Sequence, residues 1–214
     1  MLYDCRTMAD RDRGIAAAVE AVKSGELVVL PTDTVYGIGA DAFTPHAVTA
    51  LLNAKGRGRH MPPPVLVGSR HTLDGLVYSL PKTARELADA FWPGALTIIV
   101  EHSPSLQWDL GDTGGTVAVR MPLHPVALEV LRETGPMAVS SANKTGRPPA
   151  VTAEEARDQL EYSVRDYLEA GECPDPVPST IVDVTGDVPR VLRDGAVPIE
   201  KLRDVVPDIL GVGA

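Results

Sequence analysis

The six residues from Lys55 to His60 (KGRGRH) concentrate positive charge in a chain whose formal net charge is −9. No Asp or Glu occurs between Asp41 and Asp74, so no neighbour in the sequence neutralises these cations. The glycines leave the backbone free to approach a ligand, and fixed cations beside accessible backbone N–H groups suit a phosphate-bearing ligand. Taken alone, the segment is equally consistent with a solvated basic loop or a nucleic-acid patch.

Three stretches of the chain, residues 42–73, 113–128 and 134–153, contain no acidic residue. If they converge in the fold, their cations would line one positive cavity, which would concentrate anionic ligands such as ATP and carboxylates. Charge segregation this coarse can also arise by chance. The cations are Lys55, Arg57, Arg59, Arg70, Arg120, Lys144 and Arg147.

Two polar segments directly follow predicted buried strands: residues 31–39 (PTDTVYGIG) and residues 140–148 (SSANKTGRP). The carboxyl ends of strands are where α/β sheets bind ligands, and small hydroxyls and amides can donate to phosphate or carboxylate oxygens. Each segment is also consistent with an ordinary turn: a tight turn in which Gly37 and Gly39 take positive φ angles in the first, and an Asx or ST turn in the second. The chain contains neither a Walker loop nor a Rossmann glycine motif, so any nucleotide site is of another kind.

Helical and strand-like segments alternate along the chain, which is typical of an α/β fold. A capping box at Thr152 and Glu155 begins one helix, and Gly186-Asp187 indicates a hairpin. No linker or internal repeat divides the chain, so we predict a single domain. The predicted helices cover residues 10–24, 45–54, 81–91, 125–132, 152–160 and 198–206, and the predicted strands cover residues 27–30, 65–67, 96–100, 116–120, 137–139, 180–184 and 188–192.

Composition argues against several classes of protein. A pI near 5.0 and an aromatic content of 4% disfavour a dedicated nucleic-acid-binding protein. The two cysteines and five histidines show neither disulfide nor metal-site spacing, so no protein metal site is predicted. No Ser-His-Asp, Cys-His or paired-carboxylate pattern is present. The polar N-terminus and the lack of a long apolar run predict a cytoplasmic protein without a membrane partner.

Six short motifs, in their order along the chain, resemble the YrdC-like family. They are PTDTVYGIG at 31–39, KGR at 55–57, FWPG at 91–94, VAVR at 117–120, SAN at 141–143 and STIVD at 179–183. The resemblance implies one domain over residues 1–214 with its core at residues 14–200. The implied fold is α/β, a twisted mixed β-sheet with flanking helices around a positively charged cavity.

Members of this family are L-threonylcarbamoyladenylate synthases. The resemblance therefore implies a nucleotidyltransferase that converts L-threonine, bicarbonate and ATP to threonylcarbamoyl-AMP, pyrophosphate and water. The product would pass to a tRNA-modifying transferase complex that makes N6-threonylcarbamoyladenosine at tRNA position 37. Mg²⁺ would enter on the ATP phosphates, bound largely through water, and would need no protein carboxylate cage.

The resemblance also implies roles for individual residues. Arg120 can hold a carboxylate through two hydrogen bonds, and Lys55, Arg57 and Arg193 can hold phosphates. The implied catalytic residues are Lys55, Arg57, Ser141 and Asn143. The implied L-threonine contacts are Thr32, Arg120, Val139 and Ser179. The implied ATP contacts are Lys55, Arg59, Thr116, Ser141, Pro149 and Arg193.

The chain departs from the family pattern at the basic loop, where relatives have a proline after KGR and this chain has Gly58. Arg59 would then add to the phosphate site. We also expect the extra C-terminal domain of longer relatives to be missing. Two other functions remain open: a tRNA or double-stranded RNA binding module without catalysis, and a carbamoyl-adenylate-handling domain such as those in hydrogenase maturation and antibiotic carbamoylation proteins. A weak direct contact with tRNA is also left open.

Overall fold

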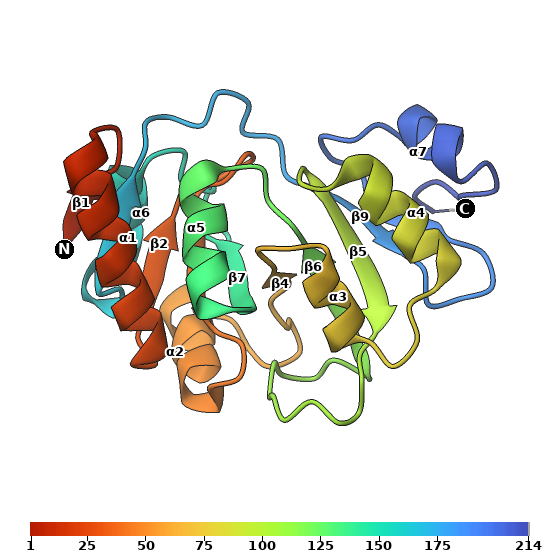
Figure 1. The fold of residues 1–214 in the computed structure, drawn as a ribbon, viewed down its shortest axis with the longest axis horizontal. Coiled ribbons are helices and arrows are strands. Elements are labelled where there is room, and N and C mark those ends of the chain that lie inside the picture. Colours follow the sequence, from red (N-terminus) through yellow and green to blue (C-terminus); the bar gives the residue numbers. More distant parts are fainter. Residues whose placement is uncertain (214) are drawn as a thin grey trace.

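The computed structural model describes residues 1–213, which form a ten-stranded mixed β-sheet with helices on both faces (Figure 1). The strand order is β1-β8-β2-β3-β7-β4-β6-β5-β9-β10. The strands are β1 (Leu2–Asp4), β2 (Val28–Leu30), β3 (Gly37–Asp41), β4 (Val65–Leu66), β5 (Leu96–Glu101), β6 (Thr116–Arg120), β7 (Met137–Ser141), β8 (Asp166–Glu169), β9 (Thr180–Asp183) and β10 (Arg190–Arg193). The helices are α1 (Met8–Lys23), α2 (Pro45–Lys55), α3 (His71–Leu76), α4 (Lys82–Phe91), α5 (Pro125–Thr134), α6 (Ala153–Leu160) and α7 (Ile199–Val205), with a 3₁₀ turn at Glu161–Ser163. None of these helices has both the length and the apolar character needed to cross a membrane.

The predicted helices and strands are all present, with small differences at their ends. The capping box at α6 is confirmed in part: the Thr152 side chain accepts a hydrogen bond from the backbone N–H of Glu155, while the Glu155 carboxylate accepts one from the backbone N–H of Val151 at 2.9 Å. The predicted hairpin is also confirmed as the antiparallel pair of β9 and β10. Strands β1, β3 and β8 and the short helix α3 were not predicted from the sequence.

Strand β3 was missed because its glycines resembled turn residues. The alternative of a tight turn with positive φ angles at Gly37 and Gly39 is excluded, since both residues are extended and pair with β2 and β7. Glycine is required here for space. A Cβ atom on Gly37 would lie 2.7 Å from Cγ1 of Val139, and one on Gly39 would lie 2.7 Å from Cε of Met137. The two glycines therefore let the side chains of β7 lie across β3.

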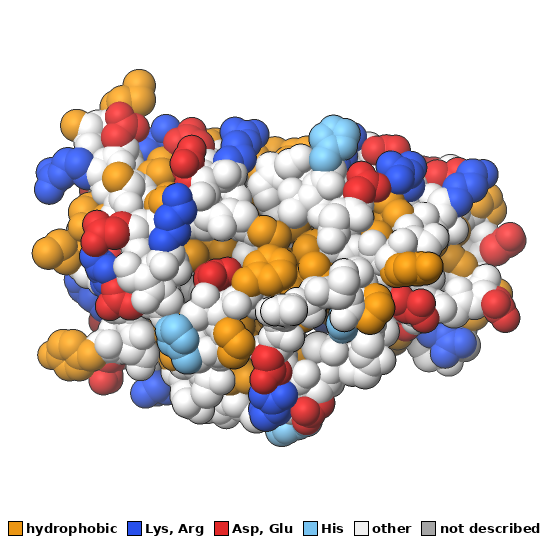
Figure 2. All heavy atoms as spheres, turned by 60° about the horizontal axis from the view of Figure 1, so that its bottom comes forward, with side chains coloured by type: hydrophobic (Ala, Val, Ile, Leu, Met, Phe, Trp, Pro, Cys, Tyr) orange, Lys and Arg blue, Asp and Glu red, His pale blue; other side chains and the backbone are white. Residues whose placement is uncertain are grey.

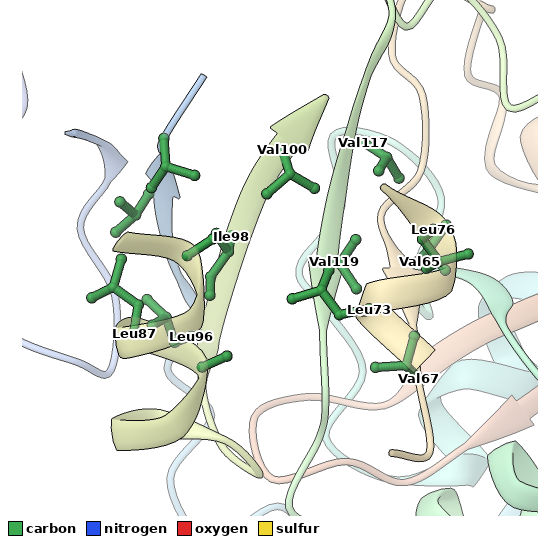
Figure 3. Packing of buried hydrophobic residues seen from close by; sticks show 14 of the residues in the cluster. Val65, Val67, Leu73, Leu76, Leu87, Leu96, Ile98, Val100, Val117 and Val119 are labelled. Carbon is green, nitrogen blue, oxygen red and sulfur yellow. The ribbon is translucent and has the colours of Figure 1, made fainter. Parts of the chain in front are cut away.

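One apolar core fills the space between β4–β6–β5–β9 and the helices α3, α4 and α7. Figure 3 shows Leu87 of α4 pointing toward Leu96 and Ile98 of β5, while Leu73 and Leu76 of α3 lie over β4 and β6. Successive residues of a strand point to opposite faces of the sheet. Because Leu96 and Ile98 are buried in this core, the residue between them and the residue directly after Ile98 on β5 must face the other side of the sheet.

At the other end of the sheet, α1 and α5 cover one face, and α2 and α6 cover the other. The back of β5, β6 and β9 has no such cover from a described helix (Figure 1). The two ends of the sheet are joined by β4, a strand of two residues that pairs with β7 on one side and β6 on the other. The uncovered back of β5, β6 and β9 is therefore bordered by loops from the other end of the sheet.

Candidate functional site

A cavity of about 470 Å³ lies behind β5 and β6. Thr97 and Ile99 of β5 and Thr116, Ala118 and Arg120 of β6 form one wall. They alternate along each strand with the residues that pack into the core on the other side, as the two-residue period of a strand requires. The hydrophobic pattern that builds the core therefore also aims hydroxyl and guanidinium groups into the cavity.

Loops from the other end of the sheet supply the opposite wall, and they come from the segments that carry the sequence motifs. Most of the predicted site residues line this one cavity: Thr32, Arg57, Thr116, Arg120, Val139, Ser141, Pro149, Ser179 and Arg193. Lys55, Arg59 and Asn143 are not among the described residues of the lining. Five of the six motifs, although separated by up to about 150 residues, thus contribute to a single site; FWPG at 91–94 supplies no described residue of the lining.

The cavity is positively charged. Arg57, Arg120 and Arg193 line it, and none of its described lining residues is Asp or Glu. Burial lowers the pKa of all three guanidinium groups, and the charge of Arg120 further lowers the pKa of Arg193. On the molecular face in Figure 2, by contrast, acidic and basic side chains are interspersed. The described lining of the cavity therefore carries only positive charge, although the protein as a whole is acidic.

Of these three arginines, the side chain of Arg57 makes the fewest hydrogen bonds to described residues. Its Nη1 atom donates to Oγ of Ser140 at 3.3 Å, and its buried Nε atom has no hydrogen-bond partner among the described residues. A buried polar group without a partner is costly unless a ligand satisfies it. Arg57 is thus positioned to bind an anion inside the cavity.

Arg193 reaches the cavity because of a β-bulge. Val191 of β10 pairs with Val182, but Arg193 pairs with Ile181, so Leu192 is an extra residue on β10. Without this bulge Arg193 would point to the same face as the buried Val191. The sequence pattern did not reveal the bulge.

The side chain of Arg193 encloses Ser179. Its Nε and Nη2 atoms donate to the Ser179 carbonyl oxygen at 3.0 and 2.6 Å, and Nη2 also donates to Oγ at 3.0 Å. The Ser179 hydroxyl also lies 2.8 Å from the hydroxyl of Thr97, which is buried on the cavity wall. Thr97 was not predicted as a site residue. Its polar character within an otherwise apolar strand was the only signal.

Arg120 is held in place by three groups. Its Nη2 atom donates to the Asp33 carboxylate at 2.6 Å, Nη1 donates to the Thr34 hydroxyl at 3.0 Å, and Nε donates to the Gly94 carbonyl at 2.9 Å. The same Asp33 oxygen accepts a bond from the backbone N–H of Leu123 at 2.8 Å. A ligand carboxylate would therefore meet a guanidinium that is already oriented, with one N–H left on each terminal nitrogen.

Lys55 lies beside the cavity and is 1% exposed. Its ammonium group donates to the backbone carbonyls of Ser141 and Asn143, the latter at 2.8 Å, and lies 3.4 Å from Oδ1 of Asn143. Burial, and then the charge of Arg57, lower the pKa of Lys55 to about 7, whereas the three oxygens favour its charged form.

Asn143 in turn donates to the carbonyls of Lys144 and Arg147, at 2.9 and 2.8 Å. Lys55 and Asn143 therefore shape the loop after β7, which presents Ser141 to the cavity. Their catalytic roles stay predictions.

Arg59 lies on the surface, where it forms ion pairs with Asp109 and Asp112. No neighbour in the sequence neutralises the basic loop, but acidic residues distant in the sequence are folded against it. Its implied contact with ATP stays a prediction. Other cations of the acid-free stretches also lie outside the described lining, so those stretches converge only in part; these are Arg70, Lys144 and Arg147.

The sequence pattern that defines the Sua5/YciO/YrdC family, described as telomere recombination, matches residues 20–195. A Mycobacterium tuberculosis protein named as a candidate threonylcarbamoyl-AMP synthase is 63% identical over 99% of this chain and 96% of its own length. The threonylcarbamoyl-AMP synthase of Bacillus subtilis is 36% identical over 94% of this chain and 59% of its own length. The crystal structure of Pyrococcus abyssi Sua5 complexed with L-threonine superposes with a TM-score of 0.92 at 34% identity, over 99% of this chain and 62% of that chain.

Proposed function

Because the chain belongs to the Sua5/YciO/YrdC family, we propose that its cavity makes threonylcarbamoyl-AMP from L-threonine, bicarbonate and ATP, with release of pyrophosphate. The observation that carries this proposal is the convergence of Arg57, Arg120 and Arg193 on one cavity whose described lining contains no carboxylate. A triphosphate and an amino-acid carboxylate both need such fixed cations. The crystal structure of the Pyrococcus abyssi relative with L-threonine supports threonine as one substrate.

In this reaction the amine of threonine attacks bicarbonate or CO₂ to form a carbamate, and water leaves when bicarbonate reacts. A carbamate oxygen then forms a bond to the α-phosphorus of ATP, and the bond to the pyrophosphate oxygen breaks. Arg120 would hold the threonine carboxylate, while Arg57 and Arg193 would hold phosphates. Catalysis would come mainly from placing the reactants together and from stabilising the charge that develops on the phosphate oxygens. This makes the enzyme a nucleotidyltransferase.

The residues present fit a magnesium ion carried by ATP better than a resident metal. No described group of three His, Cys, Asp or Glu side chains could hold a metal ion. The lining does supply hydroxyls, among them Thr32, Thr116 and Ser141, which can bind the waters of a phosphate-bound Mg²⁺. Mg²⁺ would neutralise phosphate charge, and the chain's own residues would orient the nucleotide.

The proposal is tested by incubating the protein with ATP, Mg²⁺ and bicarbonate, with and without L-threonine, while pyrophosphate and adenylate products are measured. Threonine-dependent release of pyrophosphate supports the proposal. Turnover only with carbamoyl phosphate would instead indicate a carbamoyl-adenylate-handling domain. RNA binding without turnover would indicate a binding module. A tRNA-modifying transferase complex as acceptor of the product, a weak tRNA contact and a cytoplasmic location stay predictions.

A further inference from the structure

Two loops that border the cavity are joined by Arg59. Its Nη1 and Nη2 atoms donate to the two carboxylate oxygens of Asp109 at 3.0 and 2.8 Å, and its Nε atom lies 3.6 Å from Asp112. The backbone contributes as well, because the N–H of Asp112 donates to the Arg59 carbonyl at 2.9 Å. We call this set of contacts among Arg59, Asp109 and Asp112 the Arg59 clasp.

The turn that contains Gly111 packs closely against the backbone of Arg59. Gly111 has a φ of +105°, and a Cβ atom there would lie 2.6 Å from the Arg59 carbonyl oxygen. Asp109 also accepts a hydrogen bond from the backbone N–H of Gly111 at 3.1 Å. One carboxylate therefore both shapes the turn and receives the guanidinium group.

Each side of the Arg59 clasp carries cavity residues. On one side, Arg57 lines the cavity two residues before Arg59, and Pro62 follows shortly after it. On the other side, Leu110 and Thr113 line the cavity from within the loop held by the clasp, and that loop leads directly into β6. The clasp thus connects two walls of the cavity from outside.

We propose that Arg59 is a positioning residue, which acts through Asp109 to hold these two loops together around the bound nucleotide. This inference rests on the proposed function. It differs from the role implied by the family resemblance, because Arg59 would never touch ATP. Its guanidinium fork is already matched to the Asp109 carboxylate by two parallel hydrogen bonds, the geometry in which such pairs are most specific.

The two roles predict opposite effects of removing Asp109. If Arg59 binds ATP directly, Asp109→Asn removes a competing carboxylate from its terminal nitrogens and leaves nucleotide affinity unchanged or tighter. If the Arg59 clasp positions the loops, Asp109→Asn weakens nucleotide binding as Arg59→Ala does. The two changes together should then cost no more than Arg59→Ala alone, because that change already removes the contact with Asp109. An exposed ion pair of this kind should change affinity by about threefold to fivefold.

The experiment measures the dissociation constant of the ATP analogue AMP-PNP with Mg²⁺ for the wild type, Arg59→Ala, Asp109→Asn and the double variant. Arg59→Lys keeps the charge without the fork and should restore affinity only in part. Arg70→Ala breaks an exposed ion pair with Asp89 and is the matched control. Thermal unfolding identifies any variant that fails to fold, and the Arg59→Lys and Asp109→Asn variants preserve side-chain size.

Steady-state kinetics give a second measurement. Positioning of the loops predicts a higher KM for ATP, with kcat and the KM for threonine near their wild-type values. Equal affinity of Asp109→Asn and wild type would overturn the inference, as would additive losses in the double variant. Failure of the wild type to bind AMP-PNP and to release pyrophosphate would overturn the proposed function itself, and the inference with it.

Discussion

The ammonium nitrogen of Lys55 lies 2.8 Å from the backbone carbonyl oxygen of Asn143, which joins the end of α2 to the loop after β7. Gly56 takes a left-handed φ of 63° directly after Lys55 and ends the helix there. The lysine side chain therefore leaves the last turn of a helix and is buried against carbonyl oxygens beside the cavity. A basic residue from the exposed-looking segment 55–60 has thus become part of the protein interior.

We expect Lys55→Met to destabilise the protein and to do so more strongly as the pH rises. The folded-state pKa of about 7 lies below the ordinary value of 10.5, so the unfolded chain binds more protons between these two pH values. The free energy of unfolding of the wild type, relative to Lys55→Met, should therefore rise through this window by at most about 1.4 kcal/mol per pH unit. Urea unfolding at pH 6, 7, 8 and 9 measures the difference. Lys82→Met, at an exposed lysine, is the control, and a difference independent of pH would contradict the prediction.

Arg57→Ala should separate activity from stability. The variant loses a cation that faces the cavity, and a charge-stabilising group of this kind is worth on the order of 100-fold in rate. It also removes a partly buried guanidinium with one weak hydrogen bond, so its unfolding temperature should equal or exceed that of the wild type. Threonine-dependent pyrophosphate release and thermal unfolding check the two effects. Arg147→Ala, at an exposed arginine, should change neither, and near-normal activity of Arg57→Ala would exclude its phosphate-binding role.

Asp33→Ala should destabilise the protein by about 3–5 kcal/mol, because it leaves the buried charge of Arg120 without its partner. The double variant Asp33→Ala with Arg120→Met should lose less stability than the sum of the single variants, since neither charge remains. Chemical denaturation of the wild type, the two single variants and the double variant gives the coupling energy of a double-mutant cycle. Strictly additive losses would show that the ion pair contributes nothing of its own.

Gly37→Ala should cost about 1–3 kcal/mol of stability, because the new methyl group meets Val139. Adding Val139→Ala should recover part of this loss by removing the Cγ1 atom that the methyl group would contact. Gly75→Ala is the matched control. A Cβ atom there meets no atom of residues 1–213 within 4 Å, and the helical position of Gly75 favours alanine. Equal destabilisation by both glycine changes would indicate that backbone conformation, and not crowding, explains the effect.

Much of the fold could be predicted from the sequence, because apolar periodicity reports which faces are buried. The elements that were missed break this rule. Strand β3 contains Gly37 and Gly39, whose role depends on side chains of another strand. Strand β8 begins with Asp166 and ends with Glu169, both buried, and such polar burial depends on partners from distant segments.

The candidate site was predicted where a motif supplies side chains directly to the cavity, as with Thr32, Arg120 and Ser179. It could not be predicted where tertiary contacts decide the direction of a side chain. Lys55 and Arg59 belong to one basic segment, yet one is buried against carbonyls and the other is paired with surface carboxylates. Nothing in the local sequence distinguishes these two outcomes.

The two-residue strand β4 has a consequence for how the molecule opens. It pairs with β7 through two residue pairs and with β6 through two, whereas β5 and β6 pair with each other through four. The connection between the two ends of the sheet is therefore narrow. Amide hydrogens of β2 and β3 and those of β5 and β9 should therefore exchange with solvent as two separate cooperative units. The cavity draws residues from both units, including Thr32 from one and Thr97 from the other. A bound substrate would thus act as an additional cross-link between them and slow exchange in both.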